Sequence, residues 1–321
     1  MKIKNINLTH GLCLAPLAGV SDNSFRQICR EAGAEYSVTE MISAKAVNFK
    51  NPKTLKLAKI EDCEFPAAIQ LFGGDPESMA NAAAYICDNF ALSAIDINMG
   101  CPVPKIIGGG DGSALMREPV LAGKIMCSVV KSAEAFNIPA TVKIRSGWNK
   151  TEKNAAEIAK IAEASGISAI FVHGRTREQM YAPPVDLDII REVKETVSVP
   201  VIGNGDIFSI ADAVKMIDCT KCDGIMLGRG TFGNPWIFSE ISAFFENREY
   251  IAPAGYEKIR VIKRHLDKMI FYKGEKTAML EARKHMSWYI KGCKDSASAR
   301  NRINRSSDYE EMIDIVSSVI L

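Results

Sequence analysis

Residues 95–112 read IDINMGCPVPKIIGGGDG, and the chain is best understood outward from this stretch. The sequence SAIDI, residues 93–97, predicts a short buried strand. Cys101 follows this strand between Gly100 and Pro102, a setting that favours an irregular, exposed turn over a place in an apolar core. The glycine-rich residues 108–112 predict a loop that moves over a site. The alternative is an ordinary connection with an unreactive thiol.

Short apolar segments alternate with helical segments through the first 250 residues. The expected strands are residues 12–16, 35–39, 67–72, 94–98, 140–145, 169–173, 200–203 and 224–228. The expected helices are residues 23–32, 76–89, 119–136, 151–164, 187–196, 209–217 and 235–245, while residues 42–60 are less regular. This alternation implies parallel strands, and eight repeats in roughly 245 residues are typical of a (β/α)8 TIM barrel. A doubly wound open sheet is the alternative, weakened because no G-x-G-x-x-G follows the first strand.

The last 70 residues have a different character. Residues 250–255 read as a linker, and residues 256–272, 276–290, 297–304 and 309–320 predict helices. We therefore expect a barrel domain at residues 1–250 and a C-terminal helical bundle at residues 251–321. From residue 251 onward there are 14 Lys and Arg against 9 Asp and Glu, whereas the preceding residues carry 26 against 29. This basic tail hints at a polyanionic partner, although a solvated helical surface is the simpler alternative.

The overall composition is that of a globular protein of the cytoplasm. The chain has 321 residues, 47% of them hydrophobic, with no run long enough to cross a membrane and no signal sequence at the N-terminus. Its nine cysteines lack the spacing of a disulfide framework, which favours a reducing compartment. Cys219 and Cys222 form a single C-x-x-C with no second pair, so no metal site is expected.

Nearly every expected strand ends in polar or glycine-rich residues. In a barrel the carboxyl ends of the strands meet at one face, where reactive groups gather. In strand order, these ends carry Pro16, Leu17, Ala18, Gln70, Asn98, Cys101, Lys143, Arg145, His173, Arg175, Asn204, Gly205, Asp206, Gly228 and Arg229. A single residue of this kind would more often be structural, but seven clusters at one face indicate a site.

Two of these residues have structural alternatives. Period-2 alternation turns Lys143 into the barrel mouth, where a buried ammonium needs a polar or anionic partner. That partner could simply be Asp96, which would make an internal ion pair. His173 could likewise be a hydrogen-bonded core histidine.

The turns after the last two strands predict a phosphate site. Glycine-rich turns leave backbone N–H groups free, and Arg229 adds a fork of donors suited to phosphate. A phosphorylated cofactor or substrate is therefore expected. A lysine at the other end of the site could hold a flavin ring, because positive charge near N1 stabilises the reduced form.

The polar segments together resemble the tRNA-dihydrouridine synthases, most closely their bacterial B-type branch. The matching segments are residues 15–20 (APLAGV), 70–73 (QLFG), 98–102 (NMGCP), 143–145 (KIR), 173–177 (HGRTR), 204–207 (NGDI), 228–230 (GRG), 283–285 (RKH) and 288–289 (WY). They span essentially the whole chain, and the combination is specific, although several of the segments alone are shared with other flavin barrels.

The resemblance implies an FMN enzyme that reduces the C5=C6 bond of particular tRNA uridines with NADPH. It places FMN against Pro16, Leu17, Ala18, Gln70, Lys143, His173, Asn204, Gly205, Asp206, Gly228 and Arg229. Cys101 would be the proton donor to C5 after hydride transfer from flavin N5 to C6. The base would be turned out of the tRNA, with Asn98 at the uracil edge.

The same resemblance gives candidate substrate contacts outside the reacting centre. They are Lys105 on the moving loop, Arg145, and, for tRNA phosphates, Arg175, Arg177, Lys284 and Lys291. Arg283 could instead pair with Glu281 or with other neighbours. No obligate protein partner is expected.

Two other functions compete. A small-molecule flavin oxidoreductase of the dihydroorotate dehydrogenase type would share the barrel, the phosphate turns and a catalytic cysteine, but it would not need the basic bundle. A tRNA-binding chaperone with a vestigial barrel would need the bundle but not Cys101, Lys143, His173 and Arg229.

Overall fold

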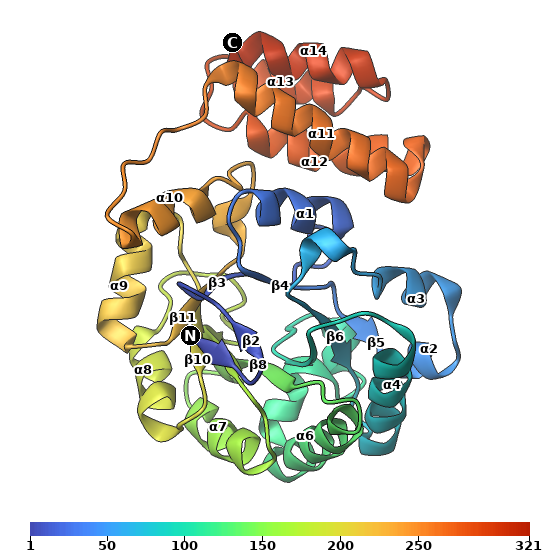
Figure 1. The fold of residues 1–321 in the computed structure, drawn as a ribbon, viewed down its shortest axis with the longest axis vertical. Coiled ribbons are helices and arrows are strands. Elements are labelled where there is room, and N and C mark those ends of the chain that lie inside the picture. Colours follow the sequence, from blue (N-terminus) through green and yellow to red (C-terminus); the bar gives the residue numbers. More distant parts are fainter.

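Eight parallel strands close into a barrel surrounded by helices (Figure 1). The computed structural model describes all 321 residues. The barrel strands are β3 (Leu12–Leu14), β4 (Tyr36–Val38), β6 (Ala67–Phe72), β7 (Ala94–Met99), β8 (Ala140–Gly147), β9 (Ile170–Thr176), β10 (Val201–Asn204) and β11 (Gly224–Leu227). Pairing of β3 with β11 and of β4 with β6 completes the ring, and the short β5 (Ile42–Ser43) pairs with β6. The TIM barrel is confirmed, and the open sheet is excluded.

The helices pack their apolar faces on the outside of the barrel. They are α1 (Asn23–Glu31), α2 (Ala44–Asn48), α3 (Pro52–Leu57), α4 (Pro76–Asn89), α5 (Pro104–Ile107), α6 (Pro119–Glu134), α7 (Ala155–Ala164), α8 (Leu187–Thr196), α9 (Ile210–Thr220) and α10 (Ile237–Phe245). Local sequence explains where α4 begins. Asp75 caps this helix by accepting from the Ser78 N–H at 2.7 Å, and Pro76 occupies its first turn. A core of 53 buried residues fills the layer between strands and helices.

Two local differences from the expected elements have clear causes. Helix α7 begins at Ala155 rather than at residue 151, because Asn149 accepts from the N–H groups of Thr151 and Glu152 and forms a turn there. The N-terminus forms an unexpected hairpin of β1 (Lys2–Ile3) and β2 (Ile6–Asn7), which lies across the middle of the barrel in Figure 1. Its apolar side chains join the cluster inside the barrel and close the barrel at the end opposite the carboxyl ends of the strands.

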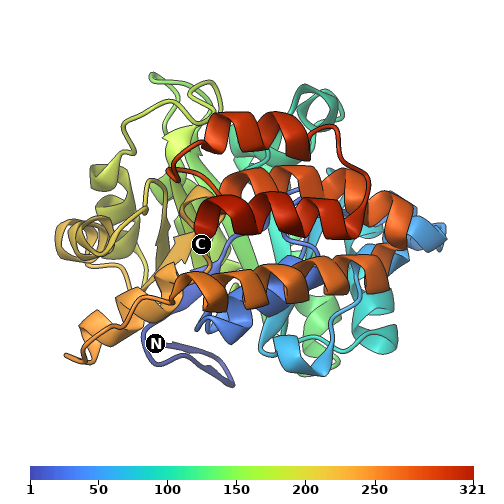
Figure 2. The same ribbon diagram turned by 90° about the horizontal axis from the view of Figure 1, so that it is seen from above.

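The C-terminal residues form a separate bundle of four helices above one side of the barrel (Figures 1 and 2). The helices are α11 (Gly255–Lys273), α12 (Glu275–Tyr289), α13 (Ser296–Ile303) and α14 (Tyr309–Ile320). They enclose their own core of 16 buried residues, from Ile259 to Val316. None of the helices in the chain combines the length and the apolar character needed to span a bilayer.

Helix α1 is the platform on which the bundle rests. Phe25 of α1 packs against His265 of α11 and His285 of α12, with ring centroids 5.7 and 5.4 Å away. Both imidazoles are buried, and burial lowers the pKa of His265 to about 4 and the pKa of His285 well below its usual value. The two rings are therefore neutral parts of the interface at neutral pH.

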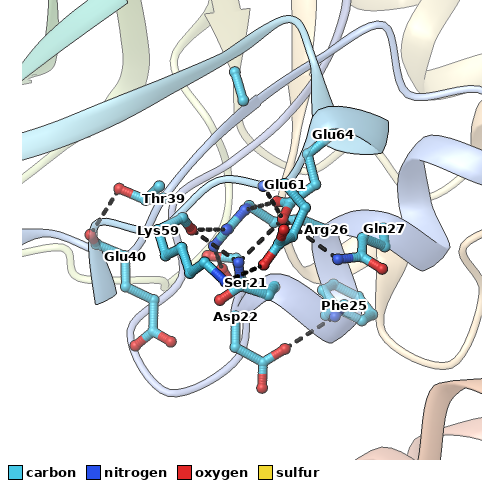
Figure 3. Close-up of polar contacts among 12 residues, drawn as sticks. Ser21, Asp22, Phe25, Arg26, Gln27, Thr39, Glu40, Lys59, Glu61 and Glu64 are labelled. Atoms are coloured by element: carbon cyan, nitrogen blue, oxygen red, sulfur yellow. Dashed lines mark hydrogen bonds and ion pairs between the residues drawn. The ribbon is translucent and has the colours of Figure 1, made fainter. Parts of the chain in front are cut away.

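A buried ion pair anchors α1 to the barrel (Figure 3). Arg26 Nε donates to Glu64 Oε2 at 2.5 Å, and the two side chains are 1% and 0% exposed. The remaining donors of Arg26 reach the carbonyls of Ser21 at 2.9 Å and Lys59 at 3.0 Å. Glu64 also accepts from Asn23 Nδ2 and from the N–H of Glu61. Each charge is thus matched by protein groups, as a buried pair requires.

Candidate active site

A cavity of about 460 Å³ opens at the carboxyl ends of the barrel strands. This volume is within the range of small-molecule and cofactor sites. Its wall includes every residue predicted to hold the cofactor, namely Pro16, Leu17, Ala18, Gln70, Lys143, His173, Asn204, Gly205, Asp206, Gly228 and Arg229. Asn98, Cys101, Arg145 and Arg175 line the same cavity. The fold therefore gathers in one place residues that are up to about 210 positions apart in the chain.

Lys143 on β8 is paired with an amide rather than with a carboxylate. Its Nζ donates to Asn204 Oδ1 at 2.9 Å, and Asn204 Nδ2 in turn donates to the Met226 carbonyl at 2.7 Å. The internal ion pair with Asp96 is thus not the main contact, although the carboxylate is close enough to favour the charged lysine. Burial, with a further contribution from Arg145, lowers the pKa of Lys143 to about 7. A buried cation in this state is ready to accept an anionic partner.

A chain of hydrogen bonds runs from the inside of the barrel to the Cys101 turn. Asp96, fully buried on β7, accepts from Thr141 Oγ1 at 2.6 Å and from Gln70 Nε2 at 2.7 Å. Gln70 Oε1 then accepts from Asn98 Nδ2 at 2.8 Å. Asn98 Oδ1 accepts from the backbone N–H groups of Gly100 at 3.2 Å and Cys101 at 2.9 Å. Asn98, predicted to orient the uracil, is therefore mainly engaged in holding the cysteine turn.

Cys101 is half-buried at the rim of the cavity. Its carbonyl accepts from Ser113 N at 3.1 Å and from Ser113 Oγ at 2.9 Å, which fixes the turn from its other side. Burial raises the pKa of the Cys101 thiol, against smaller opposite effects of the Val103 N–H and the Arg145 charge. The thiol is therefore protonated at neutral pH and can donate a proton.

The part of the cavity wall formed by β9 and by the turns after β10 and β11 carries His173 and three neighbouring charges. Burial, together with the cations of Lys143 and Arg145 nearby, lowers the pKa of His173 well below its usual value. Arg175 Nη1 lies 3.3 Å from His173 Nε2; because arginine can only donate, Nε2 is the acceptor and the imidazole is neutral. Asp206 accepts from both Arg175 and Arg229, the latter at 3.0 Å.

Arg175 is only 1% exposed, and its Nε donates to the carbonyl of Ala182. The predicted contact between Arg175 and tRNA phosphates must therefore be corrected: this side chain is part of the cavity wall. The guanidinium donors of Arg145 are likewise used in hydrogen bonds within the protein. It donates to the carbonyls of Gly100 at 2.7 Å, Thr176 at 3.0 Å and Met180 at 2.9 Å, and so ties the cysteine turn to the loop after β9.

The turns after β10 and β11 have the properties of an anion site. The backbone N–H groups of Gly205, Asp206 and Gly228 make no hydrogen bond within the protein, and all three residues line the cavity. Gly205 and Asp206 have φ angles of 131° and 50°, and a Cβ on Gly205 would lie 2.7 Å from Val185. Successive free N–H groups in such a turn bind phosphate oxygens.

The charge of the cavity also fits a flavin phosphate. The lining contains Lys143, Arg145, Arg175 and Arg229 against the single carboxylate of Asp206. Arg229 keeps 37% of its side chain exposed, so its guanidinium can reach an incoming anion. No group of three or more His, Cys, Asp and Glu side chains comes together to hold a metal.

The family model described as "Dihydrouridine synthase (Dus)" matches residues 13–320. The chain belongs to this family. The "tRNA-dihydrouridine synthase B" of Pasteurella multocida is 39% identical over 315 residues, covering 98% of this chain and 93% of its own length. The protein of that name from Pseudomonas aeruginosa is 38% identical, covering 96% and 92%. The "Probable tRNA-dihydrouridine synthase" of Rickettsia conorii is 41% identical, also covering 96% and 92%.

Two solved structures with a similar fold are distant in sequence. The old yellow enzyme homologue of Zymomonas mobilis has a TM-score of 0.52 at 12% identity, covering 78% of this chain and 94% of its own. Histamine dehydrogenase from Rhizobium has a TM-score of 0.56 at 14% identity, covering 81% and 50%. Such neighbours establish the barrel only. The expectation of an oxidoreductase of the Dus family is confirmed by the family and its relatives.

The remaining predicted substrate contacts of this Dus-family chain lie outside the cavity. Lys105 is exposed on α5, the short helix that directly precedes the glycine-rich residues 108–112 of the expected mobile loop. Arg177 stacks on the Trp148 ring, with 4.7 Å from its guanidinium carbon to the ring centroid. Lys284 Nζ donates to the carbonyl of Gly19, which follows the cavity-lining Ala18, and Lys291 is exposed just beyond α12. Arg283 donates to the Ser306 carbonyl rather than to Glu281.

The sequence analysis missed four large apolar and aromatic side chains of the cavity wall. Met41, Tyr181, Phe208 and Phe232 all line it from loops. Tyr181 lies beneath two guanidinium groups, 5.2 Å from that of Arg229 and 5.9 Å from that of Arg145. A tyrosine in the irregular segment after His173 was the only available signal for this cation–π arrangement.

Proposed function

We propose that this chain is a tRNA-dihydrouridine synthase that reduces the C5=C6 bond of D-loop uridines in tRNA, with FMN as cofactor and NADPH as reductant. The observation that carries the proposal is the position of Cys101, a protonated thiol held at the rim of a cationic cavity in a Dus-family barrel. The proposed site of action is the cytoplasm.

The cofactor would be held at two ends. Arg229 and the free N–H groups of Gly205, Asp206 and Gly228 suit the phosphate, and Lys143 suits the pyrimidine side of the ring. His173 would add a neutral hydrogen-bonding group, while Pro16, Leu17 and Ala18 supply a mostly apolar edge. Bound there, FMN would supply the hydride-transfer chemistry between NADPH and C6 of the uracil.

Cys101 completes the reduction of the base. Arrival of a hydride at C6 leaves enolate-like charge over C5 and O4, and the Cys101 thiol gives its proton to C5. The resulting thiolate takes a proton from solvent before the next turnover. Because burial raises the pKa of this thiol, it stays protonated through the neutral range and needs no separate acid.

The base must leave the folded tRNA to reach this cavity. We place the tRNA across the mouth of the barrel, with residues 251–321 as a tRNA-binding domain. Lys284 and Lys291 would meet phosphates on the bundle side, and Lys105 and Arg177 on the barrel side. Arg145 would act at the uracil end, together with Asn98, through the positions of the loops that they tie down.

The test is incubation of the purified holoprotein with NADPH and unmodified tRNA transcripts, followed by mass-spectrometric mapping of dihydrouridine. The proposal predicts dihydrouridine at defined D-loop positions. Absence of product with transcripts, but product with tRNA from a strain lacking the gene, would show that other modifications are required. Absence of product with both, from protein that binds FMN, would favour a small-molecule oxidoreductase.

A further inference from the structure

The side chain of Asp96 lies one hydrogen bond away from the cavity wall. It is fully buried on β7, and it is absent from the residues that line the cavity. Its two oxygens accept from Thr141 Oγ1 and Gln70 Nε2, at 2.6 and 2.7 Å. Burying a carboxylate is costly, and a cost of this kind in a packed barrel calls for a role.

We propose that Asp96 is a positioning residue for proton transfer, because it sets the direction of the hydrogen-bond chain that ends at the Cys101 backbone. An ionised carboxylate can only accept hydrogen bonds. It therefore forces the Gln70 amide to turn its NH2 group inward and its oxygen towards Asn98. Asn98 must then donate to Gln70 and keep its own oxygen for the cysteine turn.

The observed chain has this polarity at every step. Asn98 Nδ2 donates to Gln70 Oε1 at 2.8 Å, and Asn98 Oδ1 accepts from Cys101 N at 2.9 Å. If both amides were flipped, Asn98 would present an NH2 group to the N–H groups of Gly100 and Cys101. Two donors facing each other in a buried site would open the turn. The anion at one end and the backbone N–H groups at the other require the same orientation of the two amides, so without the anion this orientation is held from one end only.

The ionisation state of Asp96 supports this role. Burial raises its pKa to about 6, while the hydrogen bonds from Gln70 and Thr141 and the charge of Lys143 oppose the rise. The carboxylate is consequently still ionised, and still an obligatory acceptor, at neutral pH. The inference rests on the proposed function only for the identity of the step that Cys101 performs.

The first variant is Asp96→Asn, which keeps the shape but can donate towards Gln70. We expect the rate of tRNA reduction by the NADPH-reduced protein to fall by about 10- to 100-fold, as for a misplaced catalytic group. Flavin reduction by NADPH should fall less than tRNA reduction does, because Gln70 also lines the cavity, and the KM for tRNA should change less than about twofold. Equal losses in both half-reactions, or no loss in either, would overturn the inference.

A double-mutant cycle separates positioning from general damage. In a Cys101→Ala background, Asp96→Asn should cost less than about a further twofold, because the group that it positions is gone. Multiplicative losses would contradict action through Cys101. If Asp96→Asn does not fold, Thr141→Val removes one donor to the same carboxylate and should give a smaller loss of the same kind. The matched control is Ser37→Ala, a buried hydroxyl on β4 that makes no hydrogen bond, and it should be neutral.

A readout without turnover keeps this inference distinct from the proposed function. The rate of iodoacetamide labelling at each cysteine can be followed by peptide mass spectrometry. Loosening of the turn in Asp96→Asn should speed labelling of Cys101 several-fold, while labelling of the exposed Cys219 stays constant. An unchanged rate at Cys101 would overturn the inference. A wild-type protein that makes no dihydrouridine would overturn the proposed function but leave this labelling result standing.

Discussion

Two buried groups of charges in this molecule are built in opposite ways. Beneath helix α1, Arg26 and Glu64 are paired at 2.5 Å, and their remaining donors and acceptors meet carbonyls, an amide and an N–H (Figure 3). In the barrel mouth, cations outnumber carboxylates, and Lys143 has only an amide as its direct partner.

This difference in charge pairing indicates which group of charges stabilises the fold and which group serves a ligand. The matched pair needs nothing more, so we assign it to fixing α1, on which the helical bundle rests. The excess positive charge of the cavity, where Lys143 is bonded only to an amide, is costly until an anion arrives, so we assign it to a ligand. Burial alone does not distinguish the two groups; the balance of their charges does.

The largest expected effect is on the proposed reaction, and the substitution changes neither of the two groups of charges. Cys101→Ala should lower the rate of uridine reduction by about 10²- to 10⁴-fold, the usual contribution of a general acid. Flavin reduction by NADPH should be unchanged, as measured by stopped-flow absorbance. Equal rates of tRNA reduction in variant and wild type would disprove the role of Cys101.

The second effect breaks the matched pair. Glu64→Gln leaves the Arg26 charge buried without its partner, and we expect a loss of about 3–5 kcal/mol in the free energy of unfolding. The measurement is denaturant unfolding. Asp188→Asn is the control, because it breaks a pair whose partners are 46% and 81% exposed and should cost less than about 1 kcal/mol.

The third effect removes an unmatched cation. Lys143→Met should leave the apoprotein as stable as wild type or up to about 4 kcal/mol more stable, because the cost of a buried charge disappears. FMN affinity should fall about tenfold or more, as measured by fluorescence titration. A loss of stability as large as that in Glu64→Gln would remove the contrast between the two groups.

The pH dependence of the stability of the apoprotein tests whether the charge of Lys143 causes this effect. The pKa of Lys143 in the folded state is lowered to about 7, whereas the unfolded chain has the ordinary value near 10.5. Between these values the unfolded state binds more protons, so the contribution of Lys143 to stability falls as the pH decreases from about 10.5 to 7. The stability difference between wild type and Lys143→Met should therefore shrink at high pH. A difference independent of pH would show that Lys143 does not cause it.

The smallest effect concerns the surface of the bundle. Lys291→Ala should weaken tRNA binding only a few-fold and reduce the salt dependence of the affinity by about one charge. Filter binding at several salt concentrations measures both. Glu310→Ala, an acidic side chain exposed on α14, is the control of opposite charge and should not weaken binding.

Much of the barrel was predictable because each repeat has a strong local signal. All eight expected strands are present, and residues 67–72 and 76–89 match β6 and α4 at both ends. The site was predictable for the same reason, since strand ends in a barrel converge on one face. The lining residues from Pro16 to Arg229 follow from that rule and from the resemblance to the family.

The features that were missed depend on contacts distant in sequence. Nothing local shows that Phe25 packs against His285, because the two residues are 260 positions apart. The burial of Arg175 also depends on such contacts, since its partner Asp206 comes from the turn after the next strand, β10. The direction of the Asn98 amide is decided by Gln70 and Asp96, on two strands, and no motif encodes it.

The central claim is that the cationic cavity and Cys101 together reduce uridine in tRNA. The most direct test is a single turnover: the holoprotein is reduced with one equivalent of NADPH, mixed anaerobically with unmodified tRNA, and analysed for flavin oxidation and dihydrouridine. We predict one dihydrouridine for each flavin oxidised, at a rate that Cys101→Ala lowers by about 10²- to 10⁴-fold. Reduced flavin that persists in the presence of tRNA, while a small unsaturated acceptor oxidises it, would contradict the account.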